Sequence, residues 1–386
     1  MKPRTSGFAF RVLRNDGHAR AAVLTTPHGD VETPTFMPVG TQGSVKTLTP
    51  DEVASTGARV VLGNTYHLWL RPGPDRIAAF GGLHEFSRWP HVMLTDSGGF
   101  QAYSLSASGG KRAGATLKKL VAPSEEGFTF KSHLDGSAKF LSPEIAVEVQ
   151  SKIGADIQMQ LDVCPPGDSP RDVVERAVLQ TTRWAKRALA TPRKPDQALF
   201  GIVQGATFVD LRRAHADELG ALELDGLALG GFSVGEPVEK MHATLAEVAH
   251  HLDAERPRYL MGVGTPKDLL IAIGCGVDMF DCVLPTRNAR NGQALTRFGR
   301  VVIKQARYAD DRLPIDPACS CFACAGGYSR AYLRHLFVAK EILVLRLLSL
   351  HNLHYYAELV KGARDAILAG RYEAYAAAAL SELAVS

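Results

Sequence analysis

Short apolar segments recur along the chain, and most of them are followed by a stretch whose apolar residues repeat with a helical period. The apolar segments are Ser44–Leu48, Val60–Gly63, Val92–Thr95, Asp156–Leu161, Leu199–Val203, Gly226–Gly230, Tyr259–Val263 and Val277–Phe280. The amphipathic stretches include Pro143–Ile153, Pro170–Leu189, Val209–Leu219 and Pro266–Ile273. Apolar runs of this kind are typical of strands buried on both faces. Eight strand-then-helix units predict an α/β fold, a (β/α)8 TIM barrel.

The N-terminal region and a first insertion depart from this repeat. Residues 1–43 alternate apolar and polar positions and predict an antiparallel sheet, which places the barrel at residues 44–386. An insertion at residues 104–140 follows the third strand. It contains a predicted hairpin, Phe128–Leu134, with its turn at Asp135-Gly136.

A second insertion follows the eighth strand, at about residues 293–352. It begins with a predicted hairpin near Gln293–Lys304. Two helices, near Ser329–Leu348 and Tyr355–Leu368, are expected to end the chain and to close the barrel.

The first part of the earlier insertion, Ser106–Ser124, is rich in Gly, Ala and Lys. It carries Lys111, Arg112, Lys118 and Lys119 and no acidic residue. A surface loop is the simpler interpretation. A basic flap over a phosphate backbone is the alternative, and the sequence leaves both open.

Composition narrows the classes of protein only a little. The 386 residues are 46% hydrophobic and 22% charged, with a net charge of +4, which permits a polyanionic partner without requiring one. No apolar run approaches the roughly 20 residues of a membrane span, and the N-terminus has no apolar signal segment, so we expect no membrane association. Cys164, Cys275 and Cys282 are scattered, which favours a reducing cytoplasm over a disulfide framework.

The other three cysteines, Cys319, Cys321 and Cys324, fall within six positions. Three thiolates and an imidazole complete a tetrahedral zinc site. Spacing alone does not choose among His335, His351 and His354 as the fourth ligand. A full set of protein ligands would make the metal structural, whereas an open position would allow a catalytic one.

Polar residues follow several of the predicted strands. Asp96, Asp162 and Asp281 end strands three, four and eight, and Gln204 ends strand five. In a barrel these ends meet at one mouth, where chemistry is performed. A single aspartate at a strand end is often only the N-cap of the next helix, but an N-cap role does not readily account for all three.

Two carboxylates with different roles are the pattern of glycosidic-bond chemistry, one as nucleophile and one as general acid/base. Asp162 and Gln204 offer acceptors and donors for the edge of a planar heterocycle. Only His67 and His133 lie near these strand ends in the sequence, which argues against a catalytic metal centre.

Several segments resemble one family, the bacterial tRNA-guanine transglycosylases. They are TPTFMPVGTQGSVK (33–46), LGNTYHLWLRPG (62–73), LTDSGGFQ (94–101), EEGFTFKSHLDG (125–136), ALFGIVQG (198–205), RYLMGVGTP (258–266), DMFDCVLPTR (278–287), and the cysteine cluster with its later His-Asn pair. Their order covers nearly the whole chain. The resemblance implies a barrel with a zinc-binding subdomain and a homodimer formed through the zinc region.

The resemblance also implies an activity and its residues. Guanine-34 of tRNAs with a GUN anticodon would be exchanged for 7-aminomethyl-7-deazaguanine (preQ1) through a covalent intermediate, with no ATP or redox cofactor. Asp281 matches the nucleophile and Asp96 the general acid/base. The positions that match substrate-binding residues are Asp96, Ser97, Gly98, Gly99, Phe100, Asp162, Gln204 and Gly231. Cys164 and Val234 match small pocket positions of the preQ1-using type.

Two loops and four ligands complete the resemblance. The positions that match RNA-contacting loops are Gly262, Val263, Gly264, Thr265, Pro266, Lys267 and Asp268, and Thr286, Arg287, Asn288, Ala289 and Arg290. The matching ligands of a structural Zn2+, one per subunit, are Cys319, Cys321, Cys324 and His351.

The chain departs from the family pattern at several positions near the base and the RNA. Val163 replaces an acid, Phe232 and Ser233 replace Leu-Ala, and Thr265 replaces a lysine. Both carboxylates of the predicted catalytic pair are nevertheless present. Two alternatives therefore carry less weight: a non-catalytic RNA-binding relative of the same fold, and a zinc-dependent barrel hydrolase.

Overall fold

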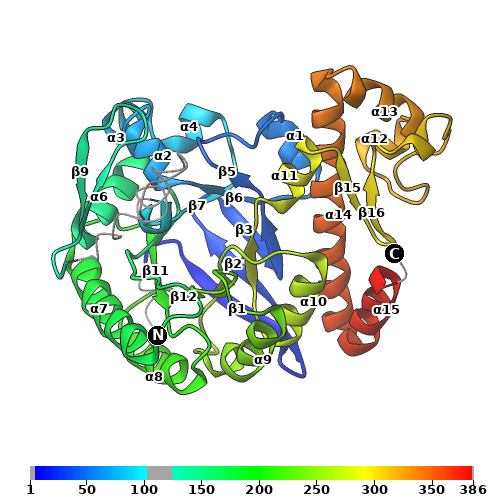
Figure 1. The fold of residues 1–386 in the computed structure, drawn as a ribbon. Helices are drawn as coiled ribbons and strands as arrows, with labels where there is room; N and C mark the ends of the chain where they lie inside the picture. Colours follow the sequence, from blue (N-terminus) through cyan, green and yellow to red (C-terminus); the bar gives the residue numbers. More distant parts are fainter. Residues whose placement is uncertain (1–4, 102–123, 385–386) are drawn as a thin grey trace.

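A computed structural model of the protein describes residues 5–101 and 124–384, and its centre is a parallel sheet that curls into a barrel (Figure 1). The strands are β4 (Thr35–Met37), β5 (Val39–Gly40), β6 (Val60–Gly63), β7 (Val92–Thr95), β10 (Ile157–Met159), β11 (Ala198–Val203), β12 (Gly226–Leu229), β13 (Arg258–Leu260) and β14 (Met279–Asp281). Their order is β4-β14-β13-β12-β11-β10-β7-β6-β5. Only Pro38 separates β4 from β5, so the sheet returns to its starting point. The predicted (β/α)8 barrel is confirmed.

The first barrel strand lies earlier in the chain than we predicted. β4 pairs with β14, and β5 pairs with β6, whereas residues 44–48 form no strand. Proline has no N–H for the ladder, so Pro38 divides the first strand into two pieces too short to give a clear apolar run. Val45 and Leu48 are buried in the core without pairing, and their apolar character misled the prediction.

A three-stranded antiparallel sheet covers one end of the barrel. It consists of β1 (Ala9–Asp16), β2 (Ala19–Thr26) and β3 (Gly29–Thr33), as the alternating pattern predicted. Leu24 and Val31 from this sheet pack in one cluster with Val60 and Val92, which begin β6 and β7. The N-terminal end of the barrel is therefore closed, and the C-terminal end stays available for a site.

Helices surround the barrel, and their apolar faces pack against the outer surface of the strands (Figure 1). The covering helices are α6 (Pro143–Ile153), α7 (Arg171–Ala190), α8 (Val209–Gly220), α9 (Val238–Val248) with the 3-10 turn η1 (Ala249–His251), and α10 (Pro266–Gly274). Shorter helices are α1 (Pro50–Ser55), α2 (Thr65–Leu70), α3 (Pro74–Ala79) and α4 (Leu83–Ser87). The predicted limits of α6, α7, α8 and α10 agree with the structure to within one residue.

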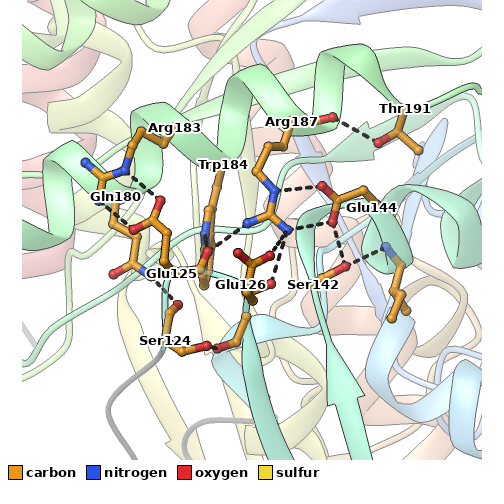
Figure 2. A network of polar contacts seen from close by, with 12 residues as sticks. Ser124, Glu125, Glu126, Ser142, Glu144, Gln180, Arg183, Trp184, Arg187 and Thr191 are labelled. Atoms are coloured by element: carbon orange, nitrogen blue, oxygen red, sulfur yellow. Dashed lines mark hydrogen bonds and ion pairs between the residues drawn. The ribbon is translucent and has the colours of Figure 1, made fainter.

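The predicted hairpin in the first insertion is present as β8 (Phe128–Lys131) and β9 (Ala138–Leu141). Figure 2 shows how side chains of α7 hold the segments that lead into and out of this hairpin. Arg183 forms a two-pronged ion pair with Glu125, and Arg187 forms one with Glu144. Trp184 donates to the Glu125 carbonyl over 2.8 Å. The basic residues expected at 111–119 lie outside the described residues.

The second insertion lies beside the barrel, against a long helix (Figure 1). Its elements are β15 (Gln293–Thr296), β16 (Gly299–Val302), η2 (Ala306–Tyr308), α12 (Phe322–Ala325) and α13 (Arg330–Val338), preceded by α11 (Leu284–Arg290) and followed by α14 (Ile342–Ala369) and α15 (Tyr372–Ala384). The hairpin prediction is confirmed. Where one domain ends and another begins stays a prediction.

The predicted limits of the last two helices were wrong. The first ends at Val338, because Lys340 takes a left-handed conformation with φ +61° that no glycine or proline announces. The next begins at Ile342 and continues through His351 and Asn352, which the prediction had placed between the two helices. Asn352 is buried and bonds Leu295 and Pro285, so its polar groups are satisfied inside the helix packing. Within residues 5–101 and 124–384, no helix is long and apolar enough to cross a membrane.

Candidate active site

A cavity of about 420 Å³ opens at the C-terminal ends of the barrel strands. It brings together residues that are far apart in the sequence. Its lining includes six of the predicted catalytic and substrate-binding residues, which are Asp96, Ser97, Phe100, Asp162, Gly231 and Asp281, and it also includes Gly262. The three aspartates predicted at the strand ends therefore share one pocket, whereas Gln204 is buried outside its lining.

Asp281 ends β14 and is held by two donors on one of its oxygens. The Tyr259 hydroxyl donates to Oδ1 over 2.6 Å, and the Gly262 N–H donates to the same atom over 2.7 Å. Among the described residues, Oδ2 has no hydrogen-bond donor. Burial raises the pKa of Asp281, and the bonds from Tyr259 and Gly262 oppose that rise. One oxygen is thus fixed by two donors, and the other has none among the described residues.

Asp96 follows β7 and binds the start of α2. Asn64, the N-cap of this helix, donates from Nδ2 to Oδ2 over 2.6 Å, and the Thr65 N–H donates to Oδ1 over 2.8 Å. The Gly98 N–H also reaches Oδ1, over 3.1 Å. A Cβ on Gly98 would lie 2.9 Å from the Tyr66 nitrogen, so this turn needs glycine.

Burial raises the pKa of Asp96 to about 7, the Thr65 N–H lowers it, and the nearby Asp281 carboxylate raises it. Two carboxyl groups in one water-poor cavity disfavour simultaneous ionisation. Asp96 can therefore both give and take a proton near neutral pH, which a general acid/base requires.

Asp162 lines the cavity and is paired with Gln204, a buried residue that lies outside the lining. Gln204 donates from Nε2 to Asp162 Oδ2 over 2.6 Å, while its Oε1 is buried without a partner in the part of the chain that the structure describes. Burial raises the pKa of Asp162 to about 6. A Cβ on Gly231 would lie 2.3 Å from Gln204 Oε1, so this contact also requires glycine. The arrangement presents the Asp162 carboxylate to a planar ligand, and Gln204 fixes the orientation of that carboxylate from outside the lining.

The departures at Phe232 and Ser233 lie in a segment that is held by local hydrogen bonds. The N–H groups of Ser233 and Val234 both donate to the carboxylate of Glu236, which supports Ser233 in a left-handed conformation with φ +58°. Phe232 is buried and lines the cavity together with Cys164 and Val234. Val163 packs against a neighbouring apolar cluster, where an acid would be desolvated.

The loop at 262–268 exposes fewer residues than its length suggests. Gly262, Thr265 and Lys267 are exposed, whereas Val263 and Gly264 are buried. Asp268 is buried as part of a capping box: its carboxylate accepts a hydrogen bond from the Thr265 hydroxyl, and its N–H donates to the Thr265 Oγ1. The position at which the family pattern has a lysine is thus occupied by Thr265, which is the N-cap of α10.

The motif at 286–290 forms the body of α11. Thr286 and Ala289 are buried, and Arg287 is exposed. Arg290 is half-buried, and its Nη1 is buried with no hydrogen-bond partner among the described residues. A desolvated guanidinium without a partner favours an external anion.

Three cysteines and one histidine converge beside α14, and they could hold a metal ion. The Sγ atoms of Cys319, Cys321 and Cys324 lie 3.7, 3.4 and 3.4 Å from His351 Nδ1. A tetrahedral zinc ion, with bonds of about 2.3 Å to sulfur and 2.0–2.1 Å to nitrogen, separates such ligands by about 3.5 Å. The His351 Nε2–H donates to the Leu295 carbonyl over 3.0 Å, which turns Nδ1 toward the sulfurs.

The tertiary structure decides the fourth member of this group. His351 is in it, whereas His354 contacts Ser320 over 3.1 Å. In residues 5–101 and 124–384, one further group of three metal-ligating side chains occurs, His28, His84 and Asp156, and it does not line the cavity. These ligand sets do not favour a zinc-dependent barrel hydrolase.

Sequence reasoning missed two residues that support the carboxylates. Asn64 directly follows β6, so the rule that identified Asp96 at a strand end would have found it too. Tyr259 lies inside β13 in an apolar run, and no sequence signal distinguishes it from a core residue.

Comparison with known proteins gives a consistent result. A family model described as queuine tRNA-ribosyltransferase matches residues 16–384. Proteins of that name are similar throughout: one from Sorangium cellulosum is 69% identical over 97% of this chain and 92% of its own length. Others from Nitratidesulfovibrio vulgaris and Moorella thermoacetica are 52% and 50% identical, over 96% and 95% of this chain and 96% of their own lengths in both cases.

Proposed function

Because the chain belongs to the queuine tRNA-ribosyltransferase family, we propose that it exchanges guanine-34 of tRNAs with a GUN anticodon for preQ1. These are the tRNAs for aspartate, asparagine, histidine and tyrosine, and the exchange is a step of queuosine biosynthesis. The observation that carries the proposal is that Asp96 and Asp281, from β7 and β14, line one cavity with Asp162. A non-catalytic RNA-binding relative would have no need of this pair.

The first half of the reaction removes guanine. An oxygen of the Asp281 carboxylate attacks C1′ of nucleotide 34, and the N-glycosidic bond breaks with its electron pair passing to guanine. Protonated Asp96 supplies the proton that the leaving base needs. The product is an ester between Asp281 and the tRNA, and the Tyr259 and Gly262 donors hold the other oxygen in place.

The second half installs the new base. The Asp96 carboxylate takes the proton from the ring nitrogen of preQ1, which attacks C1′. The ester bond breaks and the Asp281 carboxylate is restored. One glycosidic bond replaces another, so the exchange consumes no ATP and no redox cofactor.

The base would be recognised by Asp162, Gln204 and Gly231, with Phe100 available for stacking because half of its surface is exposed at the cavity. For the RNA, Arg287 and Arg290 on α11 and Lys267 on α10 provide cations beside the cavity. We expect the affinity for tRNA to fall as the salt concentration rises, with a slope that increases with the number of these cations in contact with phosphates.

We propose that the metal is one structural Zn2+ per subunit, held by Cys319, Cys321, Cys324 and His351. The thiolate-rich set suits zinc, and four protein ligands leave no position for substrate. The ion would fasten α12 and the preceding loop to α14.

We propose that two copies of the chain associate through the zinc region. Phe322 and Ile342 are 60% and 71% exposed there, and Tyr332 and Val338 on α13 are also exposed. An apolar face of this kind favours a protein partner. Ile342→Asp should give monomers by light scattering, while Leu179→Asp, at an exposed site on α7, should not. We place the reaction in the cytoplasm, where thiolates stay reduced.

The decisive experiment measures incorporation of radiolabelled guanine into tRNA with a GUN anticodon, beside the same tRNA with nucleotide 34 replaced. Incorporation only into the former is expected. Asp281→Asn should abolish both exchange and trapping of a covalent adduct, whereas Asp75→Asn, on an exposed helix, should not. A persistent adduct in Asp281→Asn would contradict the assignment of Asp281 as the nucleophile. A folded wild type that incorporates no guanine would contradict the proposed function.

A further inference from the structure

A buried arginine lies beneath the base-recognition residues, with no carboxylate partner in the described part of the chain. Arg212, on α8, is fully buried. It donates from Nε to the Ala206 carbonyl over 2.6 Å and from Nη1 to the Val203 carbonyl over 3.2 Å. From Nη2 it donates to the carbonyls of Gly230 and Gly231 over 2.9 and 3.3 Å. One guanidinium therefore ties the end of β11 to the end of β12.

A second residue of α8 holds Gln204, which lies between Val203 and Ala206 in the chain. His215, three positions after Arg212, accepts the Gln204 N–H on Nδ1 over 2.9 Å. Burial lowers the pKa of His215 to about 4, so its imidazole stays neutral and keeps this acceptor at neutral pH. Gln204 is thus held through its own backbone N–H and through the carbonyls of Val203 and Ala206, which precede and follow it in the chain.

An aromatic ring covers the guanidinium. The Cζ atom of Arg212 lies 3.7 Å from the centre of the Phe232 ring, within the range of a cation–π contact. Phe232 also lines the cavity, so the ring stands between the buried charge and the ligand. The leucine usual at this position in the family would have no ring face to offer.

We propose that Arg212 and Phe232 act together as positioning residues for base recognition, an inference that rests on the proposed function. The guanidinium fixes the two strand ends that carry Gln204 and Gly231, and the ring keeps the guanidinium in place and shields it. Substitution at either position should loosen the two residues that read the base.

The two catalytic carboxylates are supported from elsewhere. Asp96 is held by Asn64 and the start of α2, and Asp281 by Tyr259 and Gly262, and none of these donors contacts Arg212. Loss of the Arg212–Phe232 contact should therefore raise KM for the base and leave kcat nearly unchanged. A general loss of folding would instead lower both stability and kcat.

The test compares guanine exchange into tRNA, and calorimetric binding of guanine, for the full-length wild type and four variants. Arg212→Lys should raise KM and Kd for guanine about tenfold, because a single ammonium cannot reach four carbonyls. Phe232→Leu should raise them about threefold, and Phe232→Tyr, which keeps a ring face, should raise them less. Arg213→Lys, at the exposed neighbour that bonds Glu247, is the matched control.

Equal KM values for Phe232→Leu and the wild type, or a fall in kcat at constant KM, would overturn the inference. If Arg212→Lys does not fold, the two Phe232 variants still test the inference, which requires a larger rise in KM for Phe232→Leu than for Phe232→Tyr. Thermal melting identifies a variant whose loss is merely structural. A wild type that exchanges guanine normally while all four variants match it would defeat this inference alone. A wild type without any exchange would defeat the proposed function.

Discussion

The hydroxyl of Tyr259 donates a 2.6 Å hydrogen bond to Oδ1 of Asp281, from one barrel strand to the next. Both side chains are buried. Burial makes the Asp281 carboxylate costly, and this bond is one of two that lower its pKa again. If Asp281 is the nucleophile as proposed, Tyr259 helps to set the fraction of Asp281 that is ionised at a given pH, although it makes no bond to the substrate.

Tyr259→Phe should slow formation of the covalent adduct, because it removes the donor and keeps the ring. The pKa of Asp281 then rises, so a smaller fraction is ionised at low pH, and the loss should be larger at pH 6 than at pH 8. Adduct trapping against pH measures this. Tyr332→Phe, at an exposed tyrosine, is the control, and a loss of the same size at every pH would contradict the explanation.

Asn64→Ala should move the pH dependence of exchange upward. Asn64 stabilises the Asp96 carboxylate, so its removal raises the pKa of Asp96 above its value of about 7. Deprotonation of the incoming base needs the carboxylate, so the rise of rate with pH should shift to higher pH. The variant also loses a helix cap, at a cost of about 1 kcal/mol. Asn64→Ser keeps a capping oxygen and separates the two effects, and an unmoved profile would rule out this coupling.

His28→Gln should weaken the pH dependence of stability. The hydrogen bond to Asp156 raises the pKa of His28, so its contribution is complete below the unfolded pKa of about 6.5 and is lost as pH rises through the folded value. Burial alone would raise the pKa of Asp156, but bonds from His28 and His84 lower it, so that contribution is lost only as pH falls well below 4.

The Tm of the wild type should therefore fall by about 1 °C or less between pH 5.5 and 8.5 through this group, because the half-exposed His28 is screened by solvent, and His28→Gln should lose less. His91→Gln provides a control of opposite sign, because burial lowers the pKa of His91. If the Tm of His28→Gln fell more than that of the wild type over this pH range, the pKa of His28 could not be raised in the folded state.

Cys321→Ser should release the metal and destabilise the zinc region. Elemental analysis should find about one zinc per wild-type subunit and almost none in the variant. Cys275→Ser, at the end of α10 and outside the cluster, should keep the metal. Chelation that stopped exchange at once, before any change in melting or assembly, would contradict a structural role.

Much of the candidate site could be predicted from single positions in the sequence. Asp96, Asp162 and Asp281 each follow an apolar strand, and the carboxyl ends of parallel strands meet at one edge. Cys319, Cys321 and Cys324 are so close in sequence that any fold brings them together. Local spacing carried these predictions, because strand and helix periods are properties of a few adjacent residues.

Other features depend on contacts between distant segments. The first strand is divided by Pro38 and is recognised only by its pairing with β14 and β6. Tyr259 and Arg212 resemble ordinary core and surface residues until the fold places them beside Asp281 and Gly231.

The sequence by itself thus determined the barrel, the carboxylates at its mouth and the three thiolates, because periodicity and spacing are local. Only the tertiary structure decided that His351 completes the thiolate group and that Asn64 and Tyr259 hold the carboxylates. Hydrogen bonds and burial between residues tens of positions apart leave no mark on local pattern, yet they set the pKa values on which the proposed chemistry depends.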